Sequence, residues 1–252
     1  MRRFSMLPAV AVLTLAIPTA APAQLFKKPN TQDQIKLGRQ AADELRRKEK
    51  VLPSSDSRVR TLRRVGQRLL NAMPSDDPWE YTFDVIDSKE VNAFALPGGP
   101  VFFYTGLLDR MKTEDELAGV LAHELVHVRR QHWANRVAEQ QKRNLFLTGL
   151  LILGRANQQT ASLASLGNTL YTMQFSRGDE NDADTRGFKI LTDAGYNPQG
   201  MADVFRMLGS LGGKQPEFLS DHPSDKNRVN RIESLARKSG RNYPPLTPLR
   251  SN

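Results

Sequence analysis

The sequence predicts a mainly α-helical domain with one small β-sheet, an α+β fold. The first observation is a series of long segments with apolar residues at spacings of three and four, typical of helices with a buried face. The second is a short region, residues 81–104, in which alternating and extended stretches flank a Pro-Gly-Gly-Pro turn. The third is the length of 252 residues with an ordinary globular composition, which is ample for a buried core.

The N-terminus has the pattern of a cleaved secretory signal peptide over residues 1–23. Arg2 and Arg3 make it positive, an apolar run follows, and residues 21–23 form an Ala-Pro-Ala cleavage site. The apolar run is too short to span a bilayer. We therefore expect residues 24–252 to form a single domain that is soluble and periplasmic or secreted after signal cleavage.

Charge and cysteine content narrow the possible partners. The formal net charge is +9, and removing Arg2 and Arg3 with the leader leaves +7. The basic residues mostly stand beside acidic ones, as in residues 43–50, which is typical of solvated helix faces rather than a nucleic-acid surface. We expect no nucleic-acid partner. Because the chain has no cysteine, any metal must be held by nitrogen and oxygen.

The first half of the mature chain predicts two helices followed by the sheet. Residues 31–50 and 56–73 have helical apolar spacing, with only a thin apolar face in the first. Residues 81–86 alternate as a half-buried strand does, and residues 92–96 and 101–104 flank the glycine-rich turn.

The edge of this sheet is a candidate peptide-binding surface. Thin sheets beside an active-site helix commonly bind an extended peptide through backbone hydrogen bonds. We expect Asn92, Ala93, Phe94 and Ala95 to contact such a substrate. The alternative is a plain hairpin without a binding role.

The longest helical pattern, residues 113–140, carries an H-E-x-x-H motif at residues 123–127. Thr113 followed by Glu116 predicts a capping box at its start.

The motif places the groups of a zinc hydrolase on one helix. His123 and His127 lie one turn apart on one face, and Glu124 lies about 100° away, close enough to reach a metal-bound water. Zinc takes imidazole nitrogens and lowers the pKa of its water to about 7. We expect one Zn²⁺ per chain, with Glu124 as the general base; the alternative is an amphipathic helix with two solvated histidines.

An almost wholly apolar run spans residues 145–153, from Leu145 to Leu153. It is too short to cross a membrane and predicts a buried helix. The alternative is a hydrophobic surface for peripheral membrane contact or for an unfolded client. Residues 158–171 predict a further helix.

A catalytic zinc usually has three protein ligands, so a third must come from elsewhere. Residues 176–193 predict a helix in which Glu180 and Asp184 lie one turn apart. One carboxylate can ligate while the other accepts the free ring N–H of a liganding histidine. Alternatively, acidic residues in a first turn simply favour the helix dipole.

These motifs resemble those of the gluzincin zinc metallopeptidases related to CAAX prenyl proteases and HtpX. The shared features are HELVH, the later Ser-Arg-x-x-Glu-x-x-Ala-Asp stretch, Asp-His-Pro at residues 221–223, and the strand and turn at residues 92–99. The resemblance covers about residues 80–238. It implies zinc on His123, His127 and Glu180, Glu124 as base, support from Asp184 and Arg228, and His222 near the metal.

The resemblance also implies a function. Membrane-bound branches carry transmembrane helices that this sequence lacks, so the chain is similar to the soluble exported branch associated with envelope quality control. We expect a zinc-dependent endopeptidase whose substrates are unfolded or misassembled envelope polypeptides, including outer-membrane proteins. The alternatives are a periplasmic chaperone or holdase with a structural zinc and, less favoured, a prenyl-protein protease, whose cytosolic substrates an exported chain would not meet.

Two histidines lie outside the motif. His222 precedes a proline in a loop, and Ser224 and Asp225 are predicted to cap the helix that carries Arg228. Its role stays open between donating a hydrogen bond to the oxyanion of the reaction and closing the site as a fourth zinc ligand. His132 lies about 140° from His127 on a continuous helix, which predicts an ordinary surface residue.

Overall fold

The computed structural model describes residues 28–74, 76–140, 174–211, 216–222 and 227–249. The predictions for residues 1–23, 145–153 and 158–171 lie outside this part of the chain, as do those for Ser224 and Asp225. Within it, no helix combines the length and the apolar character needed to cross a membrane.

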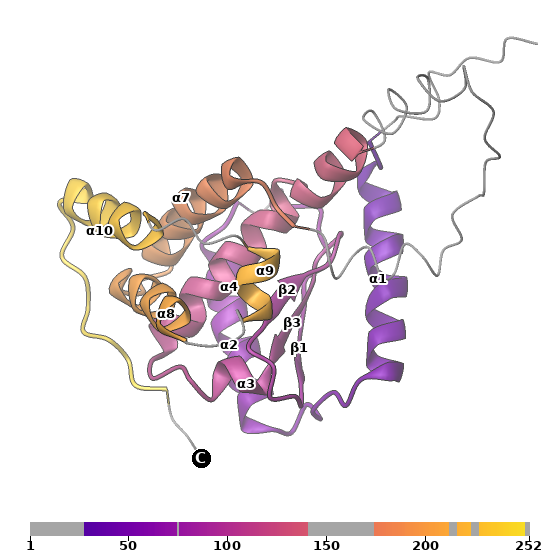
Figure 1. The fold of residues 1–252 in the computed structure, drawn as a ribbon, viewed down its shortest axis with the longest axis horizontal. Coiled ribbons are helices and arrows are strands. Elements are labelled where there is room, and N and C mark those ends of the chain that lie inside the picture. Colours follow the sequence, from indigo (N-terminus) through magenta and orange to yellow (C-terminus); the bar gives the residue numbers. More distant parts are fainter. Residues whose placement is uncertain (1–27, 75, 141–173, 212–215, 223–226, 250–252) are drawn as a thin grey trace, which may run out of the picture.

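A three-stranded sheet stands beside a group of helices, which confirms the predicted mainly α fold with a small sheet (Figure 1). The strands are β1 (Thr82–Ile86), β2 (Ala93–Ala95) and β3 (Pro100–Tyr104), in the order β1-β3-β2. β2 and β3 pair antiparallel on either side of the predicted glycine-rich turn, and β1 pairs parallel to β3. The central position of β3 leaves β2 at an edge.

Helices cover both faces of this sheet (Figure 1). α1 (Thr31–Lys48), capped by Asn30, packs its alanine and leucine face against Phe94 and Phe102 on one side. α2 (Ser57–Asn71), capped by Asp56, packs on the other side in the same cluster as Phe103 and the central helix. Both helices lie close to their predicted bounds.

The central helix is α4 (Glu114–Arg129), which begins with the predicted capping box of Thr113 and Glu116. Every residue from Glu114 to Val128 is buried, because the sheet, α2 and the C-terminal helices surround it. The prediction of one helix over residues 113–140 is wrong at its C-terminal end. The chain turns at Gln131, which takes a left-handed φ of 55°, before residues 132–140 become helical again.

Three further helices, α7 (Arg177–Asp193), α8 (Gln199–Ser210) and α10 (Arg228–Ser239), lie on the far side of α4 from the sheet (Figure 1). The short α3 (Thr105–Leu108) and α9 (Glu217–Asp221) instead lie beside the sheet: α3 directly follows β3, and the Phe218 amide of α9 donates to the Val91 carbonyl before β2. α7 confirms the predicted helix, with Ser176 as its cap. Gly187 lets α7 approach closely, since a Cβ there would lie 3.2 Å from the backbone nitrogen of His123.

Candidate metal centre

Four buried side chains from three elements converge beside α4. His123 and His127 come from α4, Glu180 comes from the first turn of α7, and His222 follows the last residue of α9. One potential ligand atom from each lies within 4.8 Å of all the others. The structure therefore brings the three predicted zinc ligands together with His222.

The spacing of these atoms fits a tetrahedral metal site. His123 Nε2 lies 3.0 Å from His127 Nε2, 3.2 Å from His222 Nδ1 and 3.4 Å from Glu180 Oε2. With zinc–ligand bonds of about 2.1 Å, tetrahedral geometry places ligand atoms about 3.4 Å apart. Nitrogen and carboxylate donors are also a donor set that zinc accepts, so the residues present fit the ion.

The electrostatics of the cluster favour a cation at its centre. Burial opposes ionisation of Glu180, but His222 and His123 outweigh it and hold the pKa of Glu180 well below its usual range. Burial likewise opposes a charge on His123, yet Glu180 raises the pKa of His123 to about 9. A carboxylate that stabilises positive charge on this ring would also stabilise a metal ion beside it. Burial lowers the pKa of His127 far below its usual value, which keeps that ring neutral as a metal ligand must be.

Glu124 lies next to the cluster with its carboxylate unsatisfied. It is buried, and neither oxygen accepts a hydrogen bond of normal geometry from the described residues. Oε1 lies 3.4 Å from His222 Nε2. Burial raises the pKa of Glu124, while His222, His123 and the Ala95 amide oppose the rise. A carboxylate with a raised pKa and free lone pairs is suited to take a proton from a water molecule.

A buried ion-pair network supports His123 from behind. Asp184 Oδ1 lies 3.1 Å from His123 Nδ1, so it can accept the ring N–H while Nε2 faces the cluster. Arg228 donates to both oxygens of Asp184, at 2.6 and 2.9 Å, and Arg231 donates to Oδ2 at 2.9 Å. Burial opposes ionisation of Asp184, but Arg228 holds its pKa at about 2. Arg228 also lies 3.2 Å from Glu180, which links both carboxylates.

His132 is not a surface residue, and that prediction is wrong. Its side chain is 5% exposed, and its Nδ1 lies 3.0 Å from Nδ1 of His127. The physical reason is the turn at Gln131, which ends α4 and brings the next residue back over His127. Neither glycine nor proline marks that turn, so the sequence pattern gave no warning of it.

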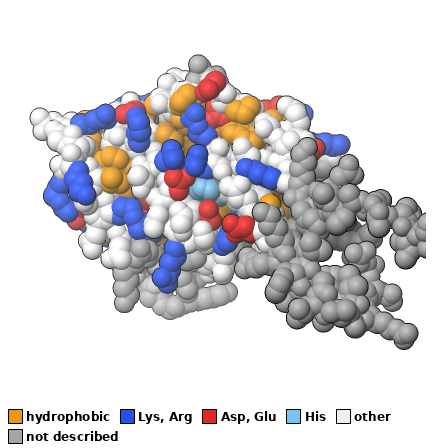
Figure 2. Space-filling view, turned by 90° about the horizontal axis from the view of Figure 1, so that it is seen from above, with side chains coloured by type: hydrophobic (Ala, Val, Ile, Leu, Met, Phe, Trp, Pro, Cys, Tyr) orange, Lys and Arg blue, Asp and Glu red, His pale blue; other side chains and the backbone are white. Residues whose placement is uncertain are grey.

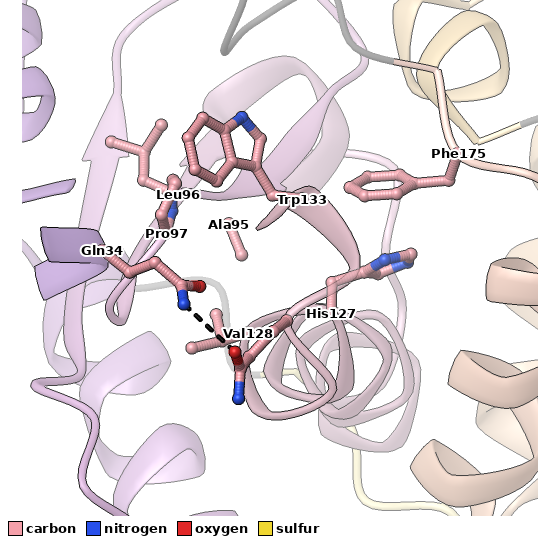
Figure 3. A pocket seen from close by; sticks show the side chains of 9 residues that line it. Gln34, Ala95, Leu96, Pro97, His127, Val128, Trp133 and Phe175 are labelled. Atoms are coloured by element: carbon pink, nitrogen blue, oxygen red, sulfur yellow. Dashed lines mark hydrogen bonds between the residues drawn. The ribbon is translucent and has the colours of Figure 1, made fainter. Parts of the chain in front are cut away.

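The predicted peptide-binding edge is only partly turned toward the cluster. Ala95 lies at the rim of a small pocket beside His127 (Figure 3). Phe94 instead stacks on Phe102, with ring centroids 5.5 Å apart, on the α1 side of the sheet. Asn92 and Ala93 are both buried, and the Asn92 side chain accepts a hydrogen bond from the Ala93 amide. Of the four predicted residues, Ala95 is therefore the one that lines this pocket.

The pocket beside His127 is mostly apolar. Trp133 and Phe175 face each other across it, and an amide hydrogen bond of 3.1 Å from Gln34 to Gln131 crosses one side (Figure 3). Phe175 packs on the ring of His127, with centroids 3.9 Å apart. Neither aromatic residue belongs to a sequence motif, and each joins the site only through tertiary packing, so neither was predicted as a site residue.

The cluster lies below the surface, since His123 and His222 are fully buried and His127 and Glu180 are almost so. Figure 2 shows that little histidine surface is visible on the face it presents, and that acidic and basic side chains surround it. The His222 ring stacks on the ring of Phe218, with centroids 4.6 Å apart. The backbone amide of His222 also donates a hydrogen bond to the Phe218 carbonyl. His222 therefore caps the end of a short helix rather than lying in an open loop.

Comparison with known proteins places the chain in a family. Residues 56–236 match the model of peptidase family M48. The metalloprotease LoiP of Escherichia coli (strain K12) is 30% identical over 225 residues, which are 86% of this chain and 87% of that protein. A putative beta-barrel assembly-enhancing protease of Vibrio cholerae is 32% identical over 194 residues, 72% of this chain and 39% of that protein. The mitochondrial metalloendopeptidase OMA1 of Arabidopsis thaliana is 35% identical over 151 residues, 60% of this chain and 30% of that protein.

The chain thus spans about two fifths of the length of the beta-barrel assembly-enhancing protease that it matches, but most of the length of LoiP. The matched region contains the H-E-x-x-H motif on α4 and the potential ligand Glu180 on α7. It also contains Asp184 on α7 and Arg228 on α10, which support His123. Both the fold and the donor set agree with a metallopeptidase that takes zinc. The chain belongs to peptidase family M48, a family of gluzincin-type metalloproteases.

Proposed function

We propose that the chain is a zinc-dependent endopeptidase that cleaves unfolded or misassembled polypeptides of the cell envelope. The observation that carries this proposal is the Glu124 carboxylate, which is buried and accepts no hydrogen bond of normal geometry from the described residues, beside a cluster of four potential metal ligands. A purely structural zinc site has no use for an unsatisfied buried carboxylate at this position, which costs free energy.

His123, His127 and Glu180 would hold the metal, and their donors fit it. Zinc, when bound, polarises a peptide carbonyl and lowers the pKa of water. Asp184 fixes the orientation of the His123 ring through the hydrogen bond at Nδ1.

Glu124 acts as the proton carrier of the reaction. It takes the proton from the water that attacks the peptide carbonyl and returns it to the leaving amine. Its raised pKa, caused by burial, suits a group that must both take and give a proton near neutral pH. Because Glu124 lies beside the β2 edge at Ala95, a peptide added to that edge would run past the carboxylate.

His222 has two possible roles, and its contacts favour one of them. Nδ1 of His222 lies 3.1 Å from Glu180 Oε1 and 3.2 Å from His123 Nε2, which is the place of a fourth ligand. We propose that it closes the site in this conformation. Under this proposal His222→Ala raises the rate of peptide cleavage. If His222 instead donates to the reaction's oxyanion, the same substitution lowers kcat by about a hundredfold.

The cellular setting is also a proposal. LoiP is named a metalloprotease, and several further relatives are named beta-barrel assembly-enhancing proteases, which supports protein substrates in the envelope. The leader pattern at residues 1–23 supports export to the periplasm. The narrower likeness to HtpX and CAAX proteases, and a peripheral membrane contact through residues 145–153, remain parts of this proposal.

Metal removal and return test the activity. The purified chain should bind about one zinc and cleave an unfolded protein such as reduced casein. A chelator should abolish cleavage, and stoichiometric zinc should restore it. A zinc-loaded, folded protein that does not cleave unfolded substrates, either as wild type or as His222→Ala, would refute the proposal.

The competing function is a holdase in which zinc only stiffens the fold. The apolar pocket between Trp133 and Phe175 is the described feature that favours it. Complementation separates the two functions, with Glu124→Gln compared with wild type in a deletion strain. Restored envelope integrity by Glu124→Gln would support the holdase, whereas the peptidase proposal predicts no restoration.

A further inference from the structure

His132 lies behind the second histidine of the motif and has no role in the chemistry described above. The helix break at Gln131 brings its ring to within 4.9 Å of the His127 ring, measured between centroids, with the planes 78° apart. The two Nδ1 atoms are 3.0 Å apart, a hydrogen-bond distance. The contact is buried at both ends.

The protons of this pair follow from the position of the metal ligands. Nε2 of His127 faces the cluster, 3.0 Å from His123 Nε2 and 3.4 Å from Glu180 Oε1. A neutral imidazole that offers Nε2 to a metal carries its proton on Nδ1. That proton points at Nδ1 of His132, which must therefore be the acceptor and carry its own proton on Nε2.

The far side of His132 agrees with this arrangement. Its Nε2 lies 3.4 Å from Asp182 Oδ2 and 3.9 Å from Asp179 Oδ1, so the N–H faces two carboxylates on α7. Asp182 is fixed by Arg130 and Arg186, at 3.0 and 2.7 Å. Asp179 is fixed by the Ser176 cap at the start of α7. The row of groups runs from the ligand His127 through His132 to acceptors held at fixed positions.

We infer that His132 is a positioning residue, which holds His127 in the tautomer and orientation needed to bind zinc through Nε2. The two histidine ligands then have different supports. His123 donates directly to the Asp184 carboxylate, whereas His127 donates to an imidazole whose other nitrogen faces Asp179 and Asp182. Outer partners of this kind typically change metal affinity by about 10- to 100-fold.

A matched pair of substitutions separates this role from simple packing. His132→Asn keeps an acceptor oxygen near the position of Nδ1, and His132→Leu keeps similar volume without an acceptor. Zinc affinity of the full chain is measured by competition with a chromophoric chelator, and melting of the metal-free proteins reports on the fold. We expect His132→Leu to lower zinc affinity by about 10- to 100-fold and His132→Asn to retain most of it.

Equal zinc affinities in both variants and wild type would overturn the inference, as would equal losses in the two variants. Nitrogen-15 NMR of the zinc-loaded wild type gives a second test that needs no variant. A proton on Nδ1 of His132 would overturn the inference, whereas a proton on its Nε2 supports it. The inference rests on the proposed zinc site but not on peptidase activity. If the wild type does not bind zinc, both the proposed zinc site and the role of His132 are refuted. If the wild type binds zinc but does not cleave peptides, the proposed function fails while the zinc-affinity comparison still tests the role of His132.

Discussion

Replacing Asp184 by asparagine tests whether the buried network behind the metal centre stabilises the fold as well as the ligand. Asp184 is fully buried and receives two hydrogen bonds from Arg228 and one from Arg231. Asparagine has nearly the same shape but no charge. Arg228 is 2% exposed, so its guanidinium would then remain buried, with Glu180 at 3.2 Å as its carboxylate contact among the described residues.

Two estimates bracket the cost of this change. Arg228 lowers the pKa of Asp184 from 3.8 to about 2, which corresponds to about 2 kcal/mol of folding free energy. Removing one partner of a buried ion pair costs about 3–5 kcal/mol, because the other charge is left uncompensated. We therefore expect Asp184→Asn to lower the free energy of unfolding by about 2–5 kcal/mol.

Urea denaturation of the metal-free protein at pH 7 measures this loss. The matched control is Asp193→Asn, since Asp193 pairs at the surface with Lys189 and Arg241 and should contribute less than about 1 kcal/mol. Because the pKa of Asp184 is depressed in the folded state, its contribution is present above about pH 4 and is lost as the pH falls toward 2. The difference between wild type and variant should shrink over that range. Equal losses in Asp184→Asn and Asp193→Asn would refute the reasoning.

Two further predictions concern the ligand set and the start of the motif helix. Glu180→Ala should lower zinc affinity well beyond the 10- to 100-fold expected for Asp184→Asn, because it removes a ligand rather than the support of a ligand. Competition with a chelator measures the zinc affinity of both variants. Equal losses of affinity would contradict the assignment of Glu180 as a ligand. Glu116→Ala removes the acceptor of the Thr113 and Lys112 amides and should cost about 1 kcal/mol, or about 2–4 °C in Tm. Calorimetry checks this, with Glu116→Gln as the control that keeps an acceptor.

Features set by neighbouring residues could be predicted from the sequence. The capping box at Thr113 depends on two side chains three residues apart, and it starts the motif helix as predicted. The one-turn spacings of His123 with His127 and of Glu180 with Asp184 likewise survive in the structure as shared helix faces. These patterns are local, so they need no knowledge of the tertiary fold.

Features set by distant contacts could not be predicted. The parallel pairing of β1 with β3 depends on which strands meet after collapse, and no spacing in the sequence encodes it. The burial of His132 depends on a turn at Gln131, which contains neither glycine nor proline. It also depends on α7, whose Asp182 lies against the His132 ring. The position of His222 depends on α9 packing through Phe218, far from the motif in sequence.

The most direct test of the central claim is to measure zinc content and peptide cleavage together in purified Glu124→Gln. The substitution keeps the shape of the side chain and leaves His123, His127 and Glu180 in place. We predict about one zinc per chain, as in wild type, and cleavage of an unfolded protein reduced at least about a hundredfold, in line with the loss of a general base. Two results would contradict the account. One is a zinc-loaded Glu124→Gln protein that cleaves at the wild-type rate, and the other is a Glu124→Gln protein that no longer binds zinc.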